Sequence, residues 1–440
     1  MSEFLELPSP ILRILEFLAP FLKFAWQIIR NWWWLPLPFL LWRPLTFLWI
    51  WWRQGKWDAT QKRVLLEIKV PKEVLKPIRA MEHVFAGIHS LHDVVVWREK
   101  WIEGQFQLSI SLELVSIGGD VHFYIRTPKS FRDVLESNIY SQYPDVEITE
   151  AEDYAKKIPQ DIPNKNWDLF GFDMVNTKPS PYPIKTYTEF EKEIALEATE
   201  EKRIDPLSNL LEGMASLRPG EQLWVQIVAR PIRTEIAWVE SGRKIIEKIT
   251  RRAVEEAPSQ AILKDALDVI ITGEPPKEAE RKEEIMPPEM KLTPGERQLV
   301  QAIEQKITKF GFSCNIRFIY LGEKSVFFKP RARIPFSFYK AISYGDVGGL
   351  KPWKVTATKV KTVFLWFLDQ RRAYLRKRKL FKNYVRRVGP LFPMHGGTFV
   401  LNTEELATLF HFPSRGGVPT AGIKRIESVR KEAPPGLPME

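Results

Sequence analysis

The histidines are the first residues whose types and spacing could support chemistry. Three of the six, His83, His89 and His92, lie close together and form the nearest approach to a metal-binding cluster in the sequence. Their spacing crosses the predicted end of a helix, and neither a cysteine nor a matched set of acidic residues stands beside them. We therefore expect ordinary histidines here and no metal centre.

Catalytic motifs are also missing from the sequence. The stretch Gly322–Ser325 has the residues Gly-Glu-Lys-Ser, but it lacks the upstream glycine and the adjacent Gly-Lys pair of a phosphate-binding loop. There is no H-E-x-x-H, C-x-x-C or G-x-S-x-G pattern. The single cysteine, Cys314, lies in an apolar run typical of a core strand and fits a reducing compartment. We expect a protein that is not an enzyme and binds no cofactor.

The most distinctive charged feature is a basic run near the C-terminus. The net charge is +11, and the segment 351–387 holds thirteen Lys and Arg residues against one acid, so this segment alone accounts for the excess. Within it, Phe367, Tyr374, Phe381 and Val385 recur at helical spacing and predict the buried seam of an amphipathic helix. The residues that we expect to contact an anionic partner are Arg371, Arg372, Arg376, Lys377, Arg378, Lys379, Lys382, Arg386 and Arg387.

Four interpretations of this basic run stay open at the level of sequence. It could be a solvated face that only packs its apolar seam, or it could bind nucleic-acid phosphates and release their counterions. It could also contact anionic lipid head groups, where each basic residue near the surface contributes on the order of 1 kcal/mol. An acidic protein partner is the fourth interpretation.

Tryptophan is concentrated at the other end of the chain, where nine of the sixteen fall within the first 57 residues. Residues 9–30 predict an amphipathic helix. The segment Trp32–Trp52 is 21 residues long, which is about the length of a bilayer span, and its only charge is Arg43. We expect a membrane anchor, with the body on the cytoplasmic side; Arg43 and three prolines leave a helix lying in the interface as the alternative. The tryptophans expected to contact lipid are Trp32, Trp33, Trp34, Trp42, Trp49, Trp51 and Trp52.

The body predicts an α+β fold. Residues 64–150 alternate strand and helix patterns in the order β-α-β-β-α-β, which is typical of a ferredoxin-like sandwich. A looser version of the same order follows, with helical insertions. The fold class expected is therefore α+β: a hydrophobic membrane anchor followed by one clear and one looser ferredoxin-like domain.

The domain boundaries follow from these patterns and from the charged, Pro-rich composition of one stretch. The predicted segments are the amphipathic helix and anchor (1–57), the first ferredoxin-like domain (58–155), the first half of the second domain (156–272), a linker (273–293), the second half of that domain (294–350), a basic helical segment with a C-terminal helix (351–415) and an extended tail (416–440).

Several stretches together resemble a known family. They are Asp205-Pro206-Leu207 with Leu210-Leu211-Glu212, Leu217–Glu221, Trp224–Ile227, Leu401–Pro413, and the basic run with Phe381 and Tyr384. These resemble the membrane-proximal, non-motor region of HerA-like ATPases of conjugative transfer and type IV secretion, over residues of about 60 to 430.

The resemblance implies a scaffold without ATP hydrolysis, because in that family a motor domain with a phosphate loop follows and the 440 residues here are too few to include one. The function expected is a membrane-anchored, non-catalytic scaffold or adaptor of a DNA-transfer or secretion apparatus. Its expected partners are membrane lipids, a separate ATPase or secretion-channel subunit, and nucleic acid. The alternative is a peripheral protein that binds anionic lipid head groups and has no role in transfer.

Overall fold

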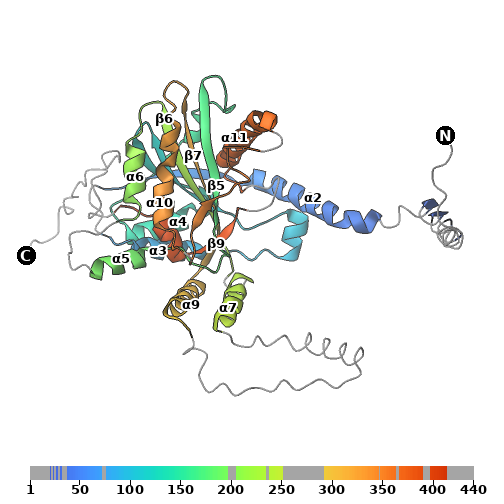
Figure 1. The fold of residues 1–440 in the computed structure, drawn as a ribbon, viewed down its shortest axis with the longest axis horizontal. Helices are drawn as coiled ribbons and strands as arrows, with labels where there is room; N and C mark the ends of the chain where they lie inside the picture. The colour runs from blue at the N-terminus through green and yellow to red at the C-terminus, as the bar shows by residue number, and fades with distance from the viewer. Residues whose placement is uncertain are drawn as a thin grey trace, which may run out of the picture. The chain divides into compact units, whose positions relative to one another are not determined.

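A computed structural model gives the fold of the chain (Figure 1). It describes residues 37–413 with gaps at 72–75, 197–204, 234–236, 251–291, 346, 363–365 and 390–396, and only isolated residues between 20 and 31 before them. The chain divides into two compact units. Unit 1 comprises residues up to Gln61 together with Val94–Phe106, and unit 2 comprises Lys62–Asp93 and all residues from Gln107 onward.

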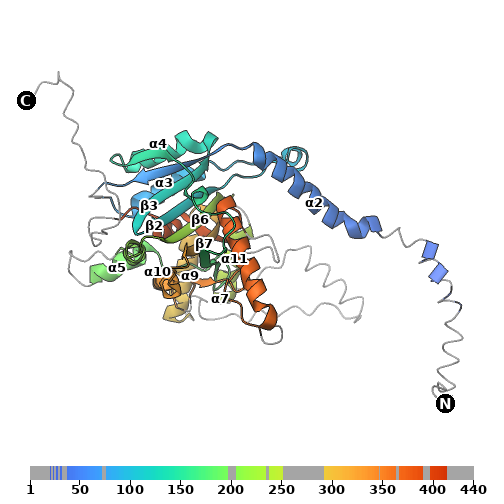
Figure 2. The same ribbon diagram turned by 90° about the horizontal axis from the view of Figure 1, so that it is seen from above.

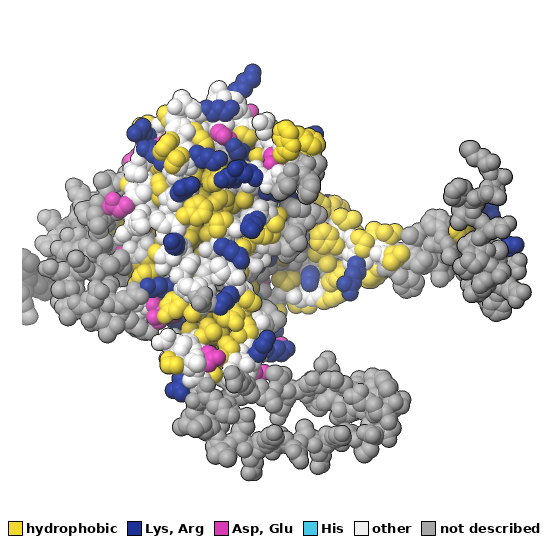
Figure 3. Space-filling view, in the orientation of Figure 1, with side chains coloured by type: hydrophobic (Ala, Val, Ile, Leu, Met, Phe, Trp, Pro, Cys, Tyr) yellow, Lys and Arg dark blue, Asp and Glu magenta, His cyan; other side chains and the backbone are white. Residues whose placement is uncertain are grey.

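Unit 1 is built from helix α2 (Leu37–Thr60) and the π-helical turn η1 (Glu99–Glu103). The indole N–H of Trp49 donates to the carbonyl of Trp101 at 2.9 Å, and Trp57 meets Phe106 edge to face at 5.1 Å. Hydrophobic side chains cover much of α2 (Figure 3). The described large apolar residues of this unit that are exposed are Trp26, Leu40, Leu41, Trp42, Leu45, Phe47, Leu48, Trp49, Trp51, Trp52, Val94, Val96, Trp97 and Ile102.

The expected N-terminal membrane anchor, and with it the fold class as predicted, is wrong. Within the described ranges no helix is both long enough and apolar enough to cross a membrane. The physical reason lies in α2, which carries Arg43 and Pro44 near its start and gives way after Trp52 to Arg53 and Lys56. Of the predicted lipid-contacting tryptophans, Trp42, Trp49, Trp51 and Trp52 lie on α2, and Trp32, Trp33 and Trp34 fall outside the described residues.

Unit 2 has the α+β composition, and its first half contains four antiparallel strands in the spatial order β4-β1-β3-β2. The alternation of apolar and polar residues forms the strands, and Gly118 and Gly119 supply the two positive φ angles that the β2–β3 turn needs. The elements are β1 (Arg63–Lys69), α3 (Arg79–His89), β2 (Ile110–Ile117), β3 (Asp120–Pro128), α4 (Arg132–Gln142) and β4 (Glu147–Ala151).

The second half has the order β6-β7-β5-β8, which is the strand order of the first half read in the opposite direction across the sheet. Strand β6 pairs with β2 from Ile110↔Ala229 to Ile117↔Gln222, so the two ferredoxin-like halves form one continuous sheet and not two separate ones. The elements are β5 (Trp167–Asn176), α5 (Tyr187–Leu196), α6 (Ser208–Ala215), β6 (Glu221–Pro231), α7 (Ala237–Thr250), α9 (Pro294–Ile307), β7 (Gly311–Glu323), α10 (Ile334–Ala341) and β8 (Leu350–Pro352).

The chain continues with helix α11 (Asp369–Arg386), strand β9 (Phe399–Asn402), which pairs with β7, and helix α12 (Thr403–Leu409). The sheet has two covered faces. Residues of α3, α4, α6, α10 and α12 pack on one face, and residues of α11 pack with Tyr154–Ile162 on the other. Figures 1 and 2 show α6 and α10 on one side of β6 and β7 and α11 on the opposite side.

The predicted linker and the predicted C-terminal tail lie largely or wholly outside the residues that the structure describes. The described part of the chain resumes at residue 292, so the predicted linker 273–293 is almost entirely undescribed, and the predicted tail 416–440 is wholly so. Residue Thr293 is described, and it begins α9 with a capping box: its hydroxyl accepts from the amide of Glu296, whose carboxylate accepts from the amide of Thr293.

Candidate functional site

Helix α11 carries most of the basic run, and its own sequence explains its position on the sheet. Leu380 and Phe381 lie four and three residues before Tyr384, and all three are buried against Trp224 and Ile319. The helix ends at Arg387, whose φ of 55° is the left-handed geometry that terminates helices. One face of α11 is therefore fixed to the sheet, and the opposite face lies on the surface.

The outward face of α11 is a basic stripe, defined here by Arg371, Arg378, Lys382 and Arg386. All four are exposed, and their spacings of seven, four and four residues place them on one side of the helix. With a rise of 1.5 Å per residue, the stripe is about 22 Å long. The only acidic residue of the helix, Asp369, lies in the first turn and accepts hydrogen bonds from Thr362. The stripe is thus a row of positive charge with no acidic residue on its face of the helix.

The structure separates the nine predicted contact residues by exposure: five are exposed, three are partly buried and one is buried. Arg371, Arg378, Lys379, Lys382 and Arg386 are exposed. Partial burial lowers the pKa of Lys379, which is exposed but is not part of the stripe.

Three other members of the predicted set are partly buried and have partners within the chain. Arg376 donates to the carbonyls of Lys354 and Ala357, and Lys377 forms an ion pair with Asp168 at 2.6 Å. Arg372 lies near the hydroxyl of Thr362 at 3.5 Å. Their main contacts hold α11 in place.

The prediction that Arg387 contacts an external partner is wrong, because its side chain is only 3% exposed. Its guanidinium binds Glu113 at 2.9 Å and Asp153 at 2.6 Å. Although burial alone would lower the pKa of Arg387, its acidic partners raise it; burial alone would raise the pKa of Asp153, and the contact with Arg387 lowers it. Arg387 therefore fastens the end of α11 to the sheet.

The same network includes aromatic hydroxyls. Tyr154 donates to Glu113 at 2.6 Å and lies 2.7 Å from the hydroxyl of Tyr384, while Gln226 donates to Glu113 at 2.9 Å. Burial raises the pKa of both tyrosines well above the usual value, so both remain protonated. Glu113 thus receives hydrogen bonds from several buried donors under α11, whereas the amide oxygen of Gln226 is buried without a hydrogen-bond partner.

The first turns of α11 and the turn before it differ from the predicted seam. Phe367 and Tyr374 are 63% and 41% exposed, not buried, because the helix rotates Leu380, Phe381 and Tyr384 toward the sheet. In the short 3-10 turn η6 (Trp366–Leu368), Trp366 is 72% exposed. Sequence reasoning missed this aromatic end. The signal was available, since an apolar run from Val363 to Leu368 directly precedes the basic run.

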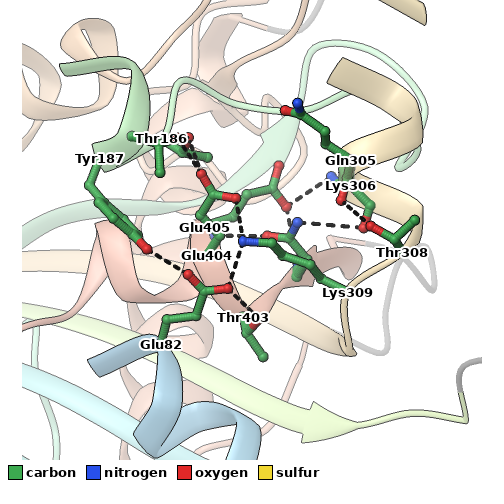
Figure 4. Close-up of polar contacts among 12 residues, drawn as sticks. Glu82, Thr186, Tyr187, Gln305, Lys306, Thr308, Lys309, Thr403, Glu404 and Glu405 are labelled. Atoms are coloured by element: carbon green, nitrogen blue, oxygen red, sulfur yellow. Dashed lines mark hydrogen bonds and ion pairs between the residues drawn. The ribbon is translucent and has the colours of Figure 1, made fainter. Parts of the chain in front are cut away.

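A second polar cluster joins α3, α12 and Lys309, which lies two residues after the end of α9 (Figure 4). The ammonium of Lys309 lies 2.7 Å from both Glu82 and Glu404, and Tyr187 donates to Glu82 at 2.6 Å. Thr186 donates to Glu404 at 2.6 Å. Although burial alone would raise the pKa of Glu404, the hydrogen bonds from Lys309 and Thr186 lower it.

The adjoining pair Lys306 and Glu405 resembles an acid–base pair in its distance of 3.0 Å, but the side chains are 1% and 0% exposed. Burial lowers the pKa of Lys306 and raises that of Glu405. A substrate has no access to either group. Glu405 also forms the capping box of α12 with Asn402, so the cluster of Figure 4 positions α12.

The histidine trio is not brought together as a site. His89 stacks on His92 at 6.1 Å and hydrogen-bonds the carbonyl of Ile232, whereas His83 is exposed on another face of α3. Among the residues that the structure describes, no three His, Cys, Asp or Glu side chains are arranged to hold a metal ion.

These features define an α+β protein with two fused ferredoxin-like halves and a basic helix on one face of the sheet. Residues 56–335 match the model of a family described as a domain of unknown function, DUF8128, and the chain belongs to that family. No curated protein matches the chain. The matched range ends in α10, so the basic stripe on α11 follows it in the sequence.

Proposed function

We propose that this chain is a peripheral membrane protein, a non-catalytic scaffold that binds anionic lipid head groups through the stripe on α11. The observation that carries the proposal is the outward row Arg371, Arg378, Lys382 and Arg386, which has no acidic residue on its face of the helix. A straight helix lying flat on a membrane brings all four charges to the surface together.

The electrostatic argument depends on number and geometry. Each Lys or Arg near an anionic leaflet contributes on the order of 1 kcal/mol, so four give a substantial but salt-sensitive attraction. The partners of Lys377 and Arg387 hold the helix so that the stripe needs no rearrangement before contact. A preorganised surface loses less conformational freedom on binding.

Unit 1 supports a membrane location by an independent observation. Helix α2 exposes Trp42, Trp49, Trp51 and Trp52, with Lys56 4.0 Å from the centre of the Trp52 ring. Tryptophan prefers the boundary between head groups and acyl chains. In this proposal α2 lies in the plane of the interface and does not cross it.

The test is flotation of the full chain with vesicles of phosphatidylcholine alone and with added phosphatidylglycerol. The double variant Arg378→Glu, Lys382→Glu should lose the extra binding caused by the anionic lipid and keep any binding to neutral vesicles. The matched control is Lys324→Glu, Lys340→Glu, which reverses two exposed lysines outside α11. Equal dependence on anionic lipid in both variants would contradict the proposal.

The second candidate function is a scaffold of a DNA-transfer apparatus, in which the same stripe contacts nucleic-acid phosphates and a separate ATPase or channel subunit docks on the body. It rests on the length and charge of the stripe together with the resemblance described above. Each neutralised phosphate adds about 0.9 to the salt slope on duplex DNA. Electrophoretic titration with duplex DNA at several salt concentrations separates the two: a steep slope that the double variant removes favours DNA, and absence of binding at low salt excludes it.

A further inference from the structure

The exposed surface of η6 and α11 changes its chemistry along the helix axis. Toward the start, four aromatic and apolar side chains are exposed beside Arg371, with exposed fractions from 41% to 72%: Trp366, Phe367, Tyr374 and Leu375. Toward the end they are basic. Hydrophobic side chains lie beside Lys and Arg over the outer end of this helix in Figure 3.

The aromatic end is held in a defined position. The carboxylate of Asp369 accepts from the hydroxyl of Thr362 at 2.7 Å and from its backbone amide at 2.9 Å. These bonds lower the pKa of Asp369, so it stays ionised and keeps the start of α11 attached to the preceding segment. Trp366 and Phe367 are thus presented outward from a fixed turn.

We propose that the turn η6 inserts its aromatic side chains into the boundary between lipid head groups and acyl chains, while the basic stripe stays at the head groups. This inference rests on the proposed membrane association and deepens it. It assigns two separable contributions to binding, one from negative surface charge and one from apolar insertion.

The observations favour lipid over the other occupants of an apolar surface. Leu375 lies on the same side of the helix as Arg371 and Arg378, so the apolar and basic parts form one continuous surface. Tryptophan and phenylalanine flanked by basic residues match the layered chemistry of an anionic membrane, which is apolar inside and negative at its surface. A nucleic acid offers stacking to aromatic rings but no apolar partner for an exposed leucine.

The lone cysteine makes a direct test practical. Cys314 is buried, so a Cys314→Ala chain can carry one new cysteine for an environment-sensitive fluorophore. We expect the fluorophore at Trp366→Cys to brighten several-fold and shift to the blue on anionic vesicles. Lipids with a quencher in the acyl chain should quench it. The same fluorophore at Ser325→Cys, an exposed position outside α11, should not change.

The outcomes separate this inference from the proposed function. If the labelled chain floats with the vesicles and the fluorophore at position 366 still reports water, insertion is wrong and peripheral binding stands. If the chain does not float at all, both fail.

A second variant tests the energetic contribution of the turn without relying on a label. Trp366→Ser, Phe367→Ser removes two exposed side chains, and partitioning into anionic vesicles in high salt should weaken by about tenfold or more. The control Phe328→Ser removes an exposed phenyl ring elsewhere and should leave partitioning unchanged. Equal partitioning of both variants would overturn the inference. So would a dimer in solution, measured by light scattering, that the double variant abolishes, since the turn would then join two copies.

Discussion

Two neighbouring arginines at the end of α11 illustrate how differently this molecule uses its basic residues. Arg386 is exposed and belongs to the basic stripe, whereas Arg387 is buried between Glu113 and Asp153. The same contrast separates the stripe from the cluster of Figure 4, where Lys306 and Lys309 are matched by Glu405, Glu82 and Glu404. Identical charges thus hold the fold together in one region and remain available to a partner in the other.

The comparison teaches that net charge is a poor guide to a binding surface until the internal pairs are subtracted. A buried ion pair stabilises the fold little more than a well-packed apolar pair does. Removing one partner, however, leaves an unpaired charge in the interior, which is strongly destabilising. An exposed charge costs almost nothing to remove from the folded state. Stability and binding should therefore respond to opposite sets of substitutions.

The largest expected effect is on stability at Arg387. The variant Arg387→Met leaves Glu113 and Asp153 without their cation, and we expect the free energy of unfolding to fall by about 3–5 kcal/mol. The neighbouring Arg386→Met should change it by no more than about 0.5 kcal/mol. Urea unfolding of both variants measures the difference. Equal losses of unfolding free energy in the two variants would contradict the conclusion that Arg387 is structural and Arg386 is not.

A smaller effect should appear in the pH dependence of stability. His411 is buried and lies 2.8 Å from Asp205; although burial alone would lower the pKa of His411, Asp205 raises it above the usual value. A folded pKa above the unfolded value of about 6.5 gives stability that is complete below pH 6.5 and is lost as the pH rises through the folded pKa. Each unit of difference corresponds to about 1.4 kcal/mol.

The measurement compares urea unfolding at pH 6 and pH 9. The wild type should lose more stability across this range than His411→Gln, while a substitution of the exposed His83 by Gln should behave as the wild type does. If His411→Gln shows the same decline as the wild type, the buried histidine is not the source of the dependence.

The smallest effect is expected at Lys377, which is intermediate between the two regions. Its ammonium pairs with Asp168 at 2.6 Å, but the two side chains are 21% and 26% exposed. Partly exposed pairs contribute about 0.2–1 kcal/mol. A double-mutant cycle with Lys377→Met and Asp168→Asn should give a coupling energy in that range. A coupling energy above about 3 kcal/mol would mean that Lys377 behaves as a buried, structural residue does, in spite of its partial exposure.

Much of the body could be predicted residue by residue, because local patterns carry the information. Alternating apolar residues mark β1, β2 and β3, the Gly118-Gly119 turn joins two of them, and the helical spacing of Leu210, Leu211 and Met214 marks α6. Other features had no local signal. The pairing of β2 with β6, which fuses the two halves, joins residues more than a hundred positions apart. The association of Val94–Phe106 with α2 in unit 1 is also non-local.

The sequence by itself determined the order of strands and helices over residues 64–150, the position of the basic run and the absence of recognisable catalytic motifs, since each depends on residue type and spacing within short windows. Only the tertiary structure decided which side of α11 faces the sheet, that Arg387 is buried while Arg386 is not, and that Phe367 and Tyr374 are exposed. The physical reason is that a helix can be rotated to bury any of several seams. The packing partners that select one seam, here Trp224 and Ile319 on the central strands, are distant in the sequence.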